Sequence, residues 1–259
     1  MCDTCGCSSG QDEFTLHTLS KEEPHNHEHH HHANEHHDHI QANKKVIPVE
    51  TDILAKNNLL AERNRGFFEA KKIIAINLVS SPGSGKTTLL ERLILVLKTT
   101  HQIYVIEGDQ QTMSDAKRIE ATGVKVVQIN TGSGCHLDAH MVNHAVKALE
   151  PEDNSILLIE NVGNLVCPAL FDLGEEKRIV IASTTEGEDK PLKYPNIFQS
   201  ANLCVLNKID LLPYLDFDLT VFKENLQKVK PGMPLIELSA KSGEGLTKLI
   251  EYLESLLVL

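Results

Sequence analysis

The chain has 259 residues and a formal net charge of −11. This length suits one α/β domain of about 200 residues with extensions. The acidic balance, without a cluster of Lys and Arg, argues against a nucleic-acid partner, which would need a basic patch. No apolar run reaches the roughly 18–20 residues that span a bilayer, and no signal-like segment opens the chain. We therefore expect no membrane partner and a cytoplasmic protein.

Residues 1–45 contain almost no large apolar side chains. Such a segment cannot offset the entropy of ordering, so we predict a disordered tail. It carries Cys2, Cys5 and Cys7 in the pattern C-x-x-C-G-C. It also holds ten of the fourteen histidines, which are His17, His25, His27, His29, His30, His31, His32, His36, His37 and His39. Thiolates and imidazoles suit Ni²⁺, Zn²⁺ or copper, so we predict a metal site at the cysteines and weaker storage sites along the histidines. Exposed thiols and a purification tag are the alternatives.

Residues 46–259 form the predicted domain. From Thr51 to about Ala70 an amphipathic pattern, which includes Leu59 and Phe68, predicts a leading helix that packs on the core. Downstream, strand-like and helix-like segments alternate, which indicates an α/β fold with a mostly parallel, doubly wound sheet. The expected strands are 73–79, 103–107, 125–129, 156–160, 179–182, 203–206 and 235–238. In this architecture ligands bind at the carboxyl ends of the strands.

The run Ser80 to Thr88 lies between the first of these strands and a helical pattern. It reads S-S-P-G-S-G-K-T-T and matches the P-loop pattern G-x-x-x-x-G-K-[ST], except that Ser80 replaces the first glycine. Backbone N–H groups of such a loop surround phosphates, the lysine reaches the β and γ phosphates, and the threonine hydroxyl binds Mg²⁺. The predicted phosphate-binding residues are Gly83, Ser84, Gly85, Lys86, Thr87 and Thr88. An ordinary glycine-rich turn is the alternative.

Two carboxylates follow expected strands. Asp109 comes after the second strand, and we predict that it contacts Mg²⁺ or a water bound to it. Glu160 ends the fourth strand and is followed by Gly163, an arrangement in which P-loop enzymes place a magnesium-linked carboxylate and a γ-phosphate-sensing N–H group. With Lys86 and Thr87 these residues form the predicted catalytic set. Either carboxylate alone could be a helix cap or turn residue; both at strand ends favour function.

Base recognition is predicted after the last two strands. Asn207, Lys208 and Asp210 form N-K-x-D, in which the carboxylate accepts the N1–H and N2 amino protons of guanine. Ser239-Ala240-Lys241 stands where GTPases support guanine O6 with a backbone N–H group. The order of P-loop, N-K-x-D and S-A-K, each after a strand, predicts a GTPase.

A second group of metal ligands lies inside the domain. Cys135 and His136 follow the third strand, and His140 and His144 recur at four-residue spacing on one helical face. Cys167 follows Gly163 in the segment expected to move when the γ phosphate is lost. Together they predict a Cys/His metal site coupled to the nucleotide, which two chains could complete across a two-fold axis. Surface imidazoles and ordinary small residues are the alternative, and Cys204 is expected in the core.

These motifs together resemble the HypB family of hydrogenase maturation GTPases. The resemblance spans nearly the whole chain through C-x-x-C-G-C, the His-rich tract, N-L-V-S-S-P-G-S-G-K-T, E-G-D-Q, G-C-H-L-D-A, E-N-V-G-N-L-V-C-P and N-K-x-D. In this family a serine at the first P-loop position is ordinary. The resemblance implies a GTP-promoted homodimer that holds nickel or zinc near its interface through Cys135, His136 and Cys167, with His140 a less certain contributor.

The resemblance also implies delivery of nickel to the precursor of a [NiFe] hydrogenase large subunit, with a HypA-type zinc protein as partner. We expect the nucleotide state to gate metal transfer, since Cys167 lies downstream of Glu160. Hydrolysis without an activating arginine should be slow. A urease-maturation GTPase and a non-enzymatic nickel store are the rival interpretations.

Overall fold

The computed structural model describes residues 14–19, 46–110 and 113–257. The predicted ligands Cys2, Cys5 and Cys7 lie outside the described residues. The same holds for the histidines of the first 45 residues, apart from His17. Their metal binding stays a prediction.

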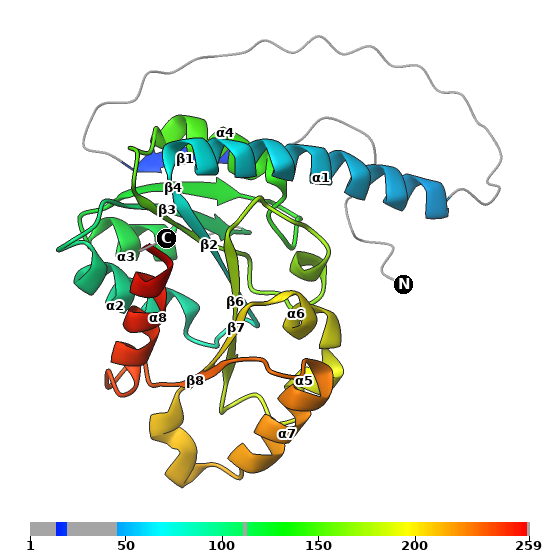
Figure 1. Cartoon of the computed structure of the whole chain (residues 1–259), viewed down its shortest axis with the longest axis vertical. Helices are drawn as coiled ribbons and strands as arrows, with labels where there is room; N and C mark the ends of the chain where they lie inside the picture. The colour runs from blue at the N-terminus through cyan, green and yellow to red at the C-terminus, as the bar shows by residue number, and fades with distance from the viewer. Residues whose placement is uncertain (1–13, 20–45, 111–112, 258–259) are drawn as a thin grey trace.

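One sheet of eight strands runs through the centre of the described chain (Figure 1). Its order is β1-β4-β3-β5-β2-β6-β7-β8, and every neighbouring pair is parallel except β1 with β4. The strands are β1 (Thr15–Leu19), β2 (Ile74–Ser80), β3 (Ile103–Asp109), β4 (Lys125–Asn130), β5 (Ile156–Glu160), β6 (Lys177–Ser183), β7 (Leu203–Asn207) and β8 (Leu235–Glu237). The predicted doubly wound α/β fold and its seven strands are confirmed.

Helices cover both faces of the sheet (Figure 1). One face carries α2 (Lys86–Leu97), α3 (Ser114–Glu120) and α8 (Leu246–Leu257), and the other carries α1 (Val46–Lys71), α4 (Ala139–Leu149), α6 (Pro195–Ser200) and α7 (Leu219–Val229). Short turns complete the set: η1 (Cys167–Ala169), α5 (Lys190–Lys193) and η2 (Ile209–Tyr214). Alternate residues of β2 face opposite layers: Ile76 and Leu78 pack with α2, while Ala75 and Val79 pack on the other side.

Strand β1 corrects the prediction that residues 1–45 are disordered throughout. It pairs antiparallel with β4, with Leu16 opposite Ile129. Phe14 and Leu16 pack against the cluster formed by α4, β3 and β4. The edge of the sheet supplies backbone hydrogen-bond partners, so two apolar side chains are enough to hold a short strand there. Composition alone does not reveal such a strand.

Helix α1 is confirmed, but the face it buries differs from the apolar pattern. Its buried residues include Asn57, Ala61, Asn64 and Phe68, whereas Leu59 is 75% exposed. Two asparagines therefore stand on the packing face, where they bind backbone groups of other segments.

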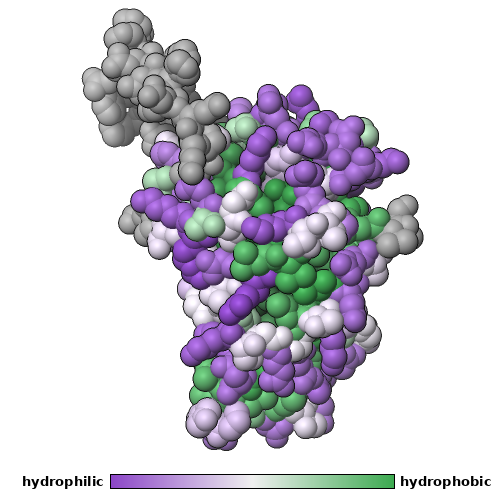
Figure 2. Space-filling model, turned by 90° about the vertical axis from the view of Figure 1, so that its left-hand side faces the viewer, coloured by the Kyte–Doolittle hydropathy of each residue, from purple (hydrophilic) through white to green (hydrophobic). Residues whose placement is uncertain are grey.

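Figure 2 views the side of the molecule that carries α2, α3 and α8. This face is largely hydrophilic, with apolar side chains gathered near its middle and again near its lower end. Within the described ranges, no helix combines the length and the apolarity needed to span a bilayer.

Candidate functional site

The loop after β2 has the geometry of a phosphate cradle. It leads directly into α2, and Gly83 and Gly85 adopt left-handed conformations with φ of 74° and 92°. At Gly85 a Cβ atom would lie 2.5 Å from Nδ2 of Asn207, so only glycine fits there. The Ser81 and Ser84 hydroxyls are buried without a hydrogen-bond partner in the structure. Such unpaired hydroxyls beside a helix N-terminus suit phosphate oxygens.

Two residues of N-K-x-D form hydrogen bonds to this loop. Asn207 donates from Nδ2 to the Ser84 carbonyl at 2.9 Å, and Lys208 donates from Nζ to the Gly83 carbonyl at 2.7 Å. Asn207 Oδ1 in turn accepts from the Ala240 N–H group at 3.0 Å. One asparagine thus connects the phosphate loop to the S-A-K segment, and the structure brings the three predicted motifs together.

Asp210 has a buried Oδ1 atom without a hydrogen-bond partner. A buried carboxylate oxygen in that state is costly unless a ligand pairs with it. Asp210 is not among the residues that line the cavity above the phosphate loop, so its role as the acceptor for guanine N–H groups stays a prediction.

Glu160 lies under the phosphate loop at the end of β5. Its Oε1 accepts from the Thr87 hydroxyl at 2.7 Å and lies 3.4 Å from Lys86 Nζ, while Oε2 is buried without a partner. Burial raises the pKa of this carboxyl group, and Lys86 opposes that shift. A threonine hydroxyl beside an unpaired carboxylate oxygen is a donor set that fits Mg²⁺, a cation that prefers oxygen ligands.

Sequence reasoning missed Glu107, Asp115 and Arg118. Carboxylate oxygens of Glu107, Asp115 and Glu160 all lie within 4.8 Å of one another. Burial, reinforced by the charge of Glu160, raises the pKa of Glu107 from 4.5 to about 9. The pairing of β3 with β5 explains the contact, because Glu107, two residues before the end of β3, lies directly opposite Glu160, the last residue of β5.

Asp109, the residue predicted instead, accepts from the Gln110 N–H group at 2.6 Å and lies outside that carboxylate group. It still lines the cavity above the loop. This cavity of about 410 Å³ is bounded by the phosphate loop and by the ends of β3 and β5, and its lining includes Gly108, Asp115, Arg118, Val162 and Gly163.

Three of the predicted internal metal ligands converge. Cys135 Sγ lies 2.9 Å from Cys167 Sγ and 3.9 Å from His136 Nδ1. Burial lowers the pKa of His136, which favours the neutral imidazole that binds metals. The His136 ring stacks on Phe171, with centroids 3.9 Å apart. Two thiols and an imidazole suit Ni²⁺ or Zn²⁺ and leave a coordination position open.

His140 lies elsewhere. The structure does not bring it into the group of Cys135, His136 and Cys167; its Nε2 lies 3.1 Å from Nε2 of His144, one helical turn along α4. The Phe14 ring packs edge-on against both imidazoles. A metal-binding role for His140 at the Cys/His group is not supported by this placement.

The segment after β5 touches both sites. A Cβ atom on Gly163 would lie 3.1 Å from Pro82 Cα, so the glycine sits against the phosphate loop. Four residues later comes Cys167, and between them Asn164 donates from Nδ2 to the Cys135 carbonyl at 3.3 Å. A few residues therefore separate the phosphate cavity from the Cys167 thiol.

The chain is similar to known proteins over most of its length. The family described as CobW/HypB/UreG, nucleotide-binding domain, matches residues 74–237. The chain is 46% identical to the hydrogenase maturation factor HypB of Escherichia coli K12, with 98% of this chain and 99% of that protein covered. It is 56% identical to HypB of Rhizobium leguminosarum bv. viciae, with 82% and 71% covered.

Two solved structures resemble the fold at 40% sequence identity. HypB from Archaeoglobus fulgidus superimposes with a TM-score of 0.73, covering 78% of this chain and 99% of that one. HypB from Helicobacter pylori, solved in complex with nickel, gives a TM-score of 0.72, covering 77% and 94%.

Proposed function

The chain belongs to the HypB family of hydrogenase maturation factors, and from that membership we propose that it is a GTP-hydrolysing nickel metallochaperone. In this proposal it inserts nickel into the precursor of a [NiFe] hydrogenase large subunit, and its nucleotide state controls when the metal leaves. Nickel is the cargo and GTP is the substrate.

Guanine selection is supported by the unpaired Oδ1 of Asp210. Within Ser239-Ala240-Lys241, the Ser239 and Ala240 N–H groups already donate to the Glu244 carbonyl and to Asn207 Oδ1. We therefore assign recognition of guanine O6 to the Lys241 N–H group.

Hydrolysis is supported by the residues around the cavity. Lys86 supplies positive charge to the β and γ phosphates, and loop N–H groups from Gly83 to Thr88 hold the phosphate oxygens. The Thr87 hydroxyl and the Glu160 carboxylate would hold Mg²⁺, with Asp109 binding through water; when bound, the cation neutralises charge on the β and γ phosphates. The Gly163 N–H group would contact the γ phosphate.

The observation that carries the proposal is the position of Cys167. Its thiol lies 2.9 Å from that of Cys135, and its own segment begins against the phosphate loop at Gly163. Ordering of this segment by GTP would change the geometry of the thiol pair and with it the affinity for nickel or zinc.

Partners follow from the family. We propose a GTP-promoted homodimer, whose second copy completes the coordination left open by Cys135, His136 and Cys167. A HypA-type zinc or nickel accessory protein would share in delivery to the hydrogenase precursor. The activity would take place in the cytoplasm, where thiols stay reduced, and the cysteines and histidines of residues 1–45 would bind and store nickel.

The test measures two properties of the full chain: GTP hydrolysis, and the nickel affinity of the internal site with a GTP analogue or with GDP. Lys86→Ala should abolish hydrolysis, and Cys167→Ala should remove one bound metal without affecting GDP binding. Cys204→Ala is the matched control, because it removes a buried thiol in β7 away from both sites. A nickel store would bind metal equally in both nucleotide states, and that result would refute the proposal.

A further inference from the structure

Asn161 connects the nucleotide loop to the metal-binding loop. It follows β5 directly, next to Glu160, and is 1% exposed. Its Oδ1 atom accepts two backbone hydrogen bonds, each of 3.0 Å: one from the N–H group of Leu137 and one from the N–H group of Val162. A single side-chain oxygen thus holds two segments that are 25 positions apart in sequence.

Each of the two donors adjoins one site. Leu137 directly follows His136 and is itself fully buried, so the position of its N–H group fixes the metal-binding loop. Val162 directly precedes Gly163, which packs against Pro82 of the phosphate loop. One chain of contacts from the phosphate loop to the metal loop therefore passes through this acceptor atom, and the bond from Asn164 to the Cys135 carbonyl is a second connection.

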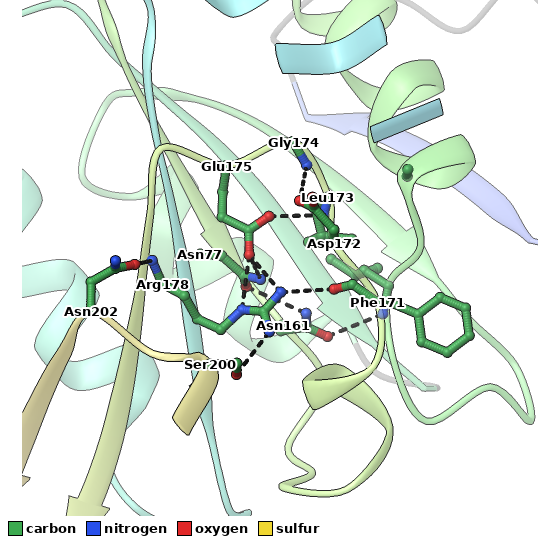
Figure 3. A network of polar contacts seen from close by, with 12 residues as sticks. Asn77, Asn161, Phe171, Asp172, Leu173, Gly174, Glu175, Arg178, Ser200 and Asn202 are labelled. Carbon is green, nitrogen blue, oxygen red and sulfur yellow. Dashed lines mark hydrogen bonds and ion pairs between the residues drawn. The ribbon is translucent and has the colours of Figure 1, made fainter. Parts of the chain in front are cut away.

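The rest of the Asn161 side chain is oriented by a buried polar network (Figure 3). Its Nδ2 donates to Asn77 Oδ1 at 3.4 Å, and Asn77 donates to Glu175 Oε1 at 3.0 Å. Glu175 forms an ion pair with Arg178 at 2.8 Å. These groups belong to the rigid strands β2 and β6 and to the turn before β6, so the asparagine amide has a fixed orientation.

The same network reaches the metal site from the opposite side. Arg178 donates from Nη2 to the carbonyl of Phe171 at 2.8 Å, and the Phe171 ring stacks on His136. The His136 imidazole thus contacts the ring of Phe171, and the backbone of Phe171 is hydrogen-bonded to the network that orients Asn161.

We propose that Asn161 is a positioning residue that couples the nucleotide state to metal affinity, because its Oδ1 holds the Val162 and Leu137 N–H groups together. The inference rests on the gating proposed above and names the residue that transmits it. When the Gly163 N–H group turns toward or away from a γ phosphate, the Val162 N–H group next to it changes its bond to Oδ1. The bond from Leu137 to the same atom then changes with it, and the loop that carries Cys135 and His136 moves.

A shared acceptor couples its donors more directly than separate bonds would, since strain at one N–H group acts on the atom that holds the other. Coupling between sites typically changes affinity by about 5- to 150-fold. Spatial adjacency alone does not establish coupling, so the experiment measures the change in nickel affinity between nucleotide states.

Three variants distinguish the effect of losing the Oδ1 acceptor from the effect of disturbing the fold. Asn161→Leu keeps the approximate shape and removes the acceptor. Asn161→Asp keeps an acceptor oxygen for both N–H groups, replaces the donor to Asn77 by a second acceptor and adds a buried carboxyl group beside Glu160. Asn225→Leu is the matched control, a buried asparagine on α7 that donates to the Glu188 carbonyl, away from both sites.

Nickel affinity of each full-length variant is measured with a GTP analogue and with GDP, and GDP binding reports the fold. We expect the ratio of the two affinities to fall to within about twofold of one in Asn161→Leu, and to persist in Asn161→Asp and Asn225→Leu. A folded Asn161→Leu variant with the wild-type ratio would overturn the inference while leaving gating intact. If the wild-type chain itself binds nickel with equal affinity in the two nucleotide states, both the gating proposal and this inference are refuted.

Hydrogen exchange in the wild-type chain gives a second test that needs no variant. Exchange of the Leu137 amide should differ between the GTP-analogue and GDP states, because its bond to Oδ1 changes with that of Val162. If nickel affinity changes with nucleotide while Leu137 exchange stays constant, the coupling does not pass through Asn161. This measurement decides the question even if Asn161→Leu fails to fold.

Discussion

Replacing Glu107 by glutamine should stabilise the nucleotide-free protein, and the gain should grow with pH. Glu107 is buried beside Glu160, and burial raises its pKa to about 9. Between pH 4.5 and 9 the folded state therefore keeps a proton that the unfolded state releases. Under this condition the free energy of unfolding falls as pH rises, and the neutral glutamine removes that dependence.

The magnitude follows from the size of the shift. Each pKa unit corresponds to about 1.4 kcal/mol, so at pH 7.5 the three units above the ordinary value give an upper bound of about 4 kcal/mol. Near pH 4.5 the difference in the free energy of unfolding between Glu107→Gln and the wild type approaches zero. The neighbouring charges of Glu160 and Asp109 contribute to the shift, so part of it should persist if only one of them is removed.

Denaturant unfolding of the nucleotide-free protein at pH 5, 6.5 and 8 measures this difference. Glu251→Gln, at an exposed position of α8, controls for the loss of one negative charge. If the difference between Glu107→Gln and the wild type is the same at pH 5 and pH 8, Glu107 does not carry a raised pKa in the folded protein. The interpretation that Glu107 stays protonated beside Glu160 in the folded protein would then be wrong.

Two further substitutions test the nucleotide site. Asp210→Asn should weaken GTP binding by roughly 10- to 100-fold and favour xanthosine triphosphate, because an amide donor replaces an acceptor oxygen; unchanged preference in competition binding would argue against Asp210 as the base reader. Gly85→Ala should abolish GDP binding, because its Cβ would meet Asn207 at 2.5 Å and its φ of 92° is strained for alanine. Gly66→Ala, on α1 with no atom within 4 Å of the added Cβ, is the control and should keep full GDP binding.

The sequence was sufficient for seven of the eight strands of the described sheet and for most of the motif residues, because both depend on local patterns of residue types. Apolar runs predicted the seven parallel strands, and the P-loop, N-K-x-D and Cys/His spacings predicted residues that the fold brings together, apart from His140. What it could not predict are contacts made by polar residues across elements. Nothing local shows that Asn207 braces the phosphate loop or that Glu107 lies opposite Glu160.

Helix α1 shows the same limit. Its apolar pattern suggested a helix that merely packs on the core, yet its packing face carries Asn57 and Asn64. Asn57 accepts from the Ala139 N–H group at 2.9 Å and donates to the Asp172 carbonyl at 2.8 Å. Asn64 donates to the carbonyls of Ala139 and Leu173, at 2.9 and 3.0 Å. Which backbone groups need such partners depends on loops far along the chain.

Buried polar side chains also limit how far a movement of the segment after β5 could extend. The segment that carries Cys167 is fixed at its start by Asn161 and at its end by Glu175, which accepts from the Leu173 N–H group at 2.8 Å. Between these ends Val166 is 57% exposed and Leu170 is 47% exposed. Buried hydrogen bonds at both ends and exposed apolar side chains between them would confine any nucleotide-driven change to the stretch that holds the Cys167 thiol.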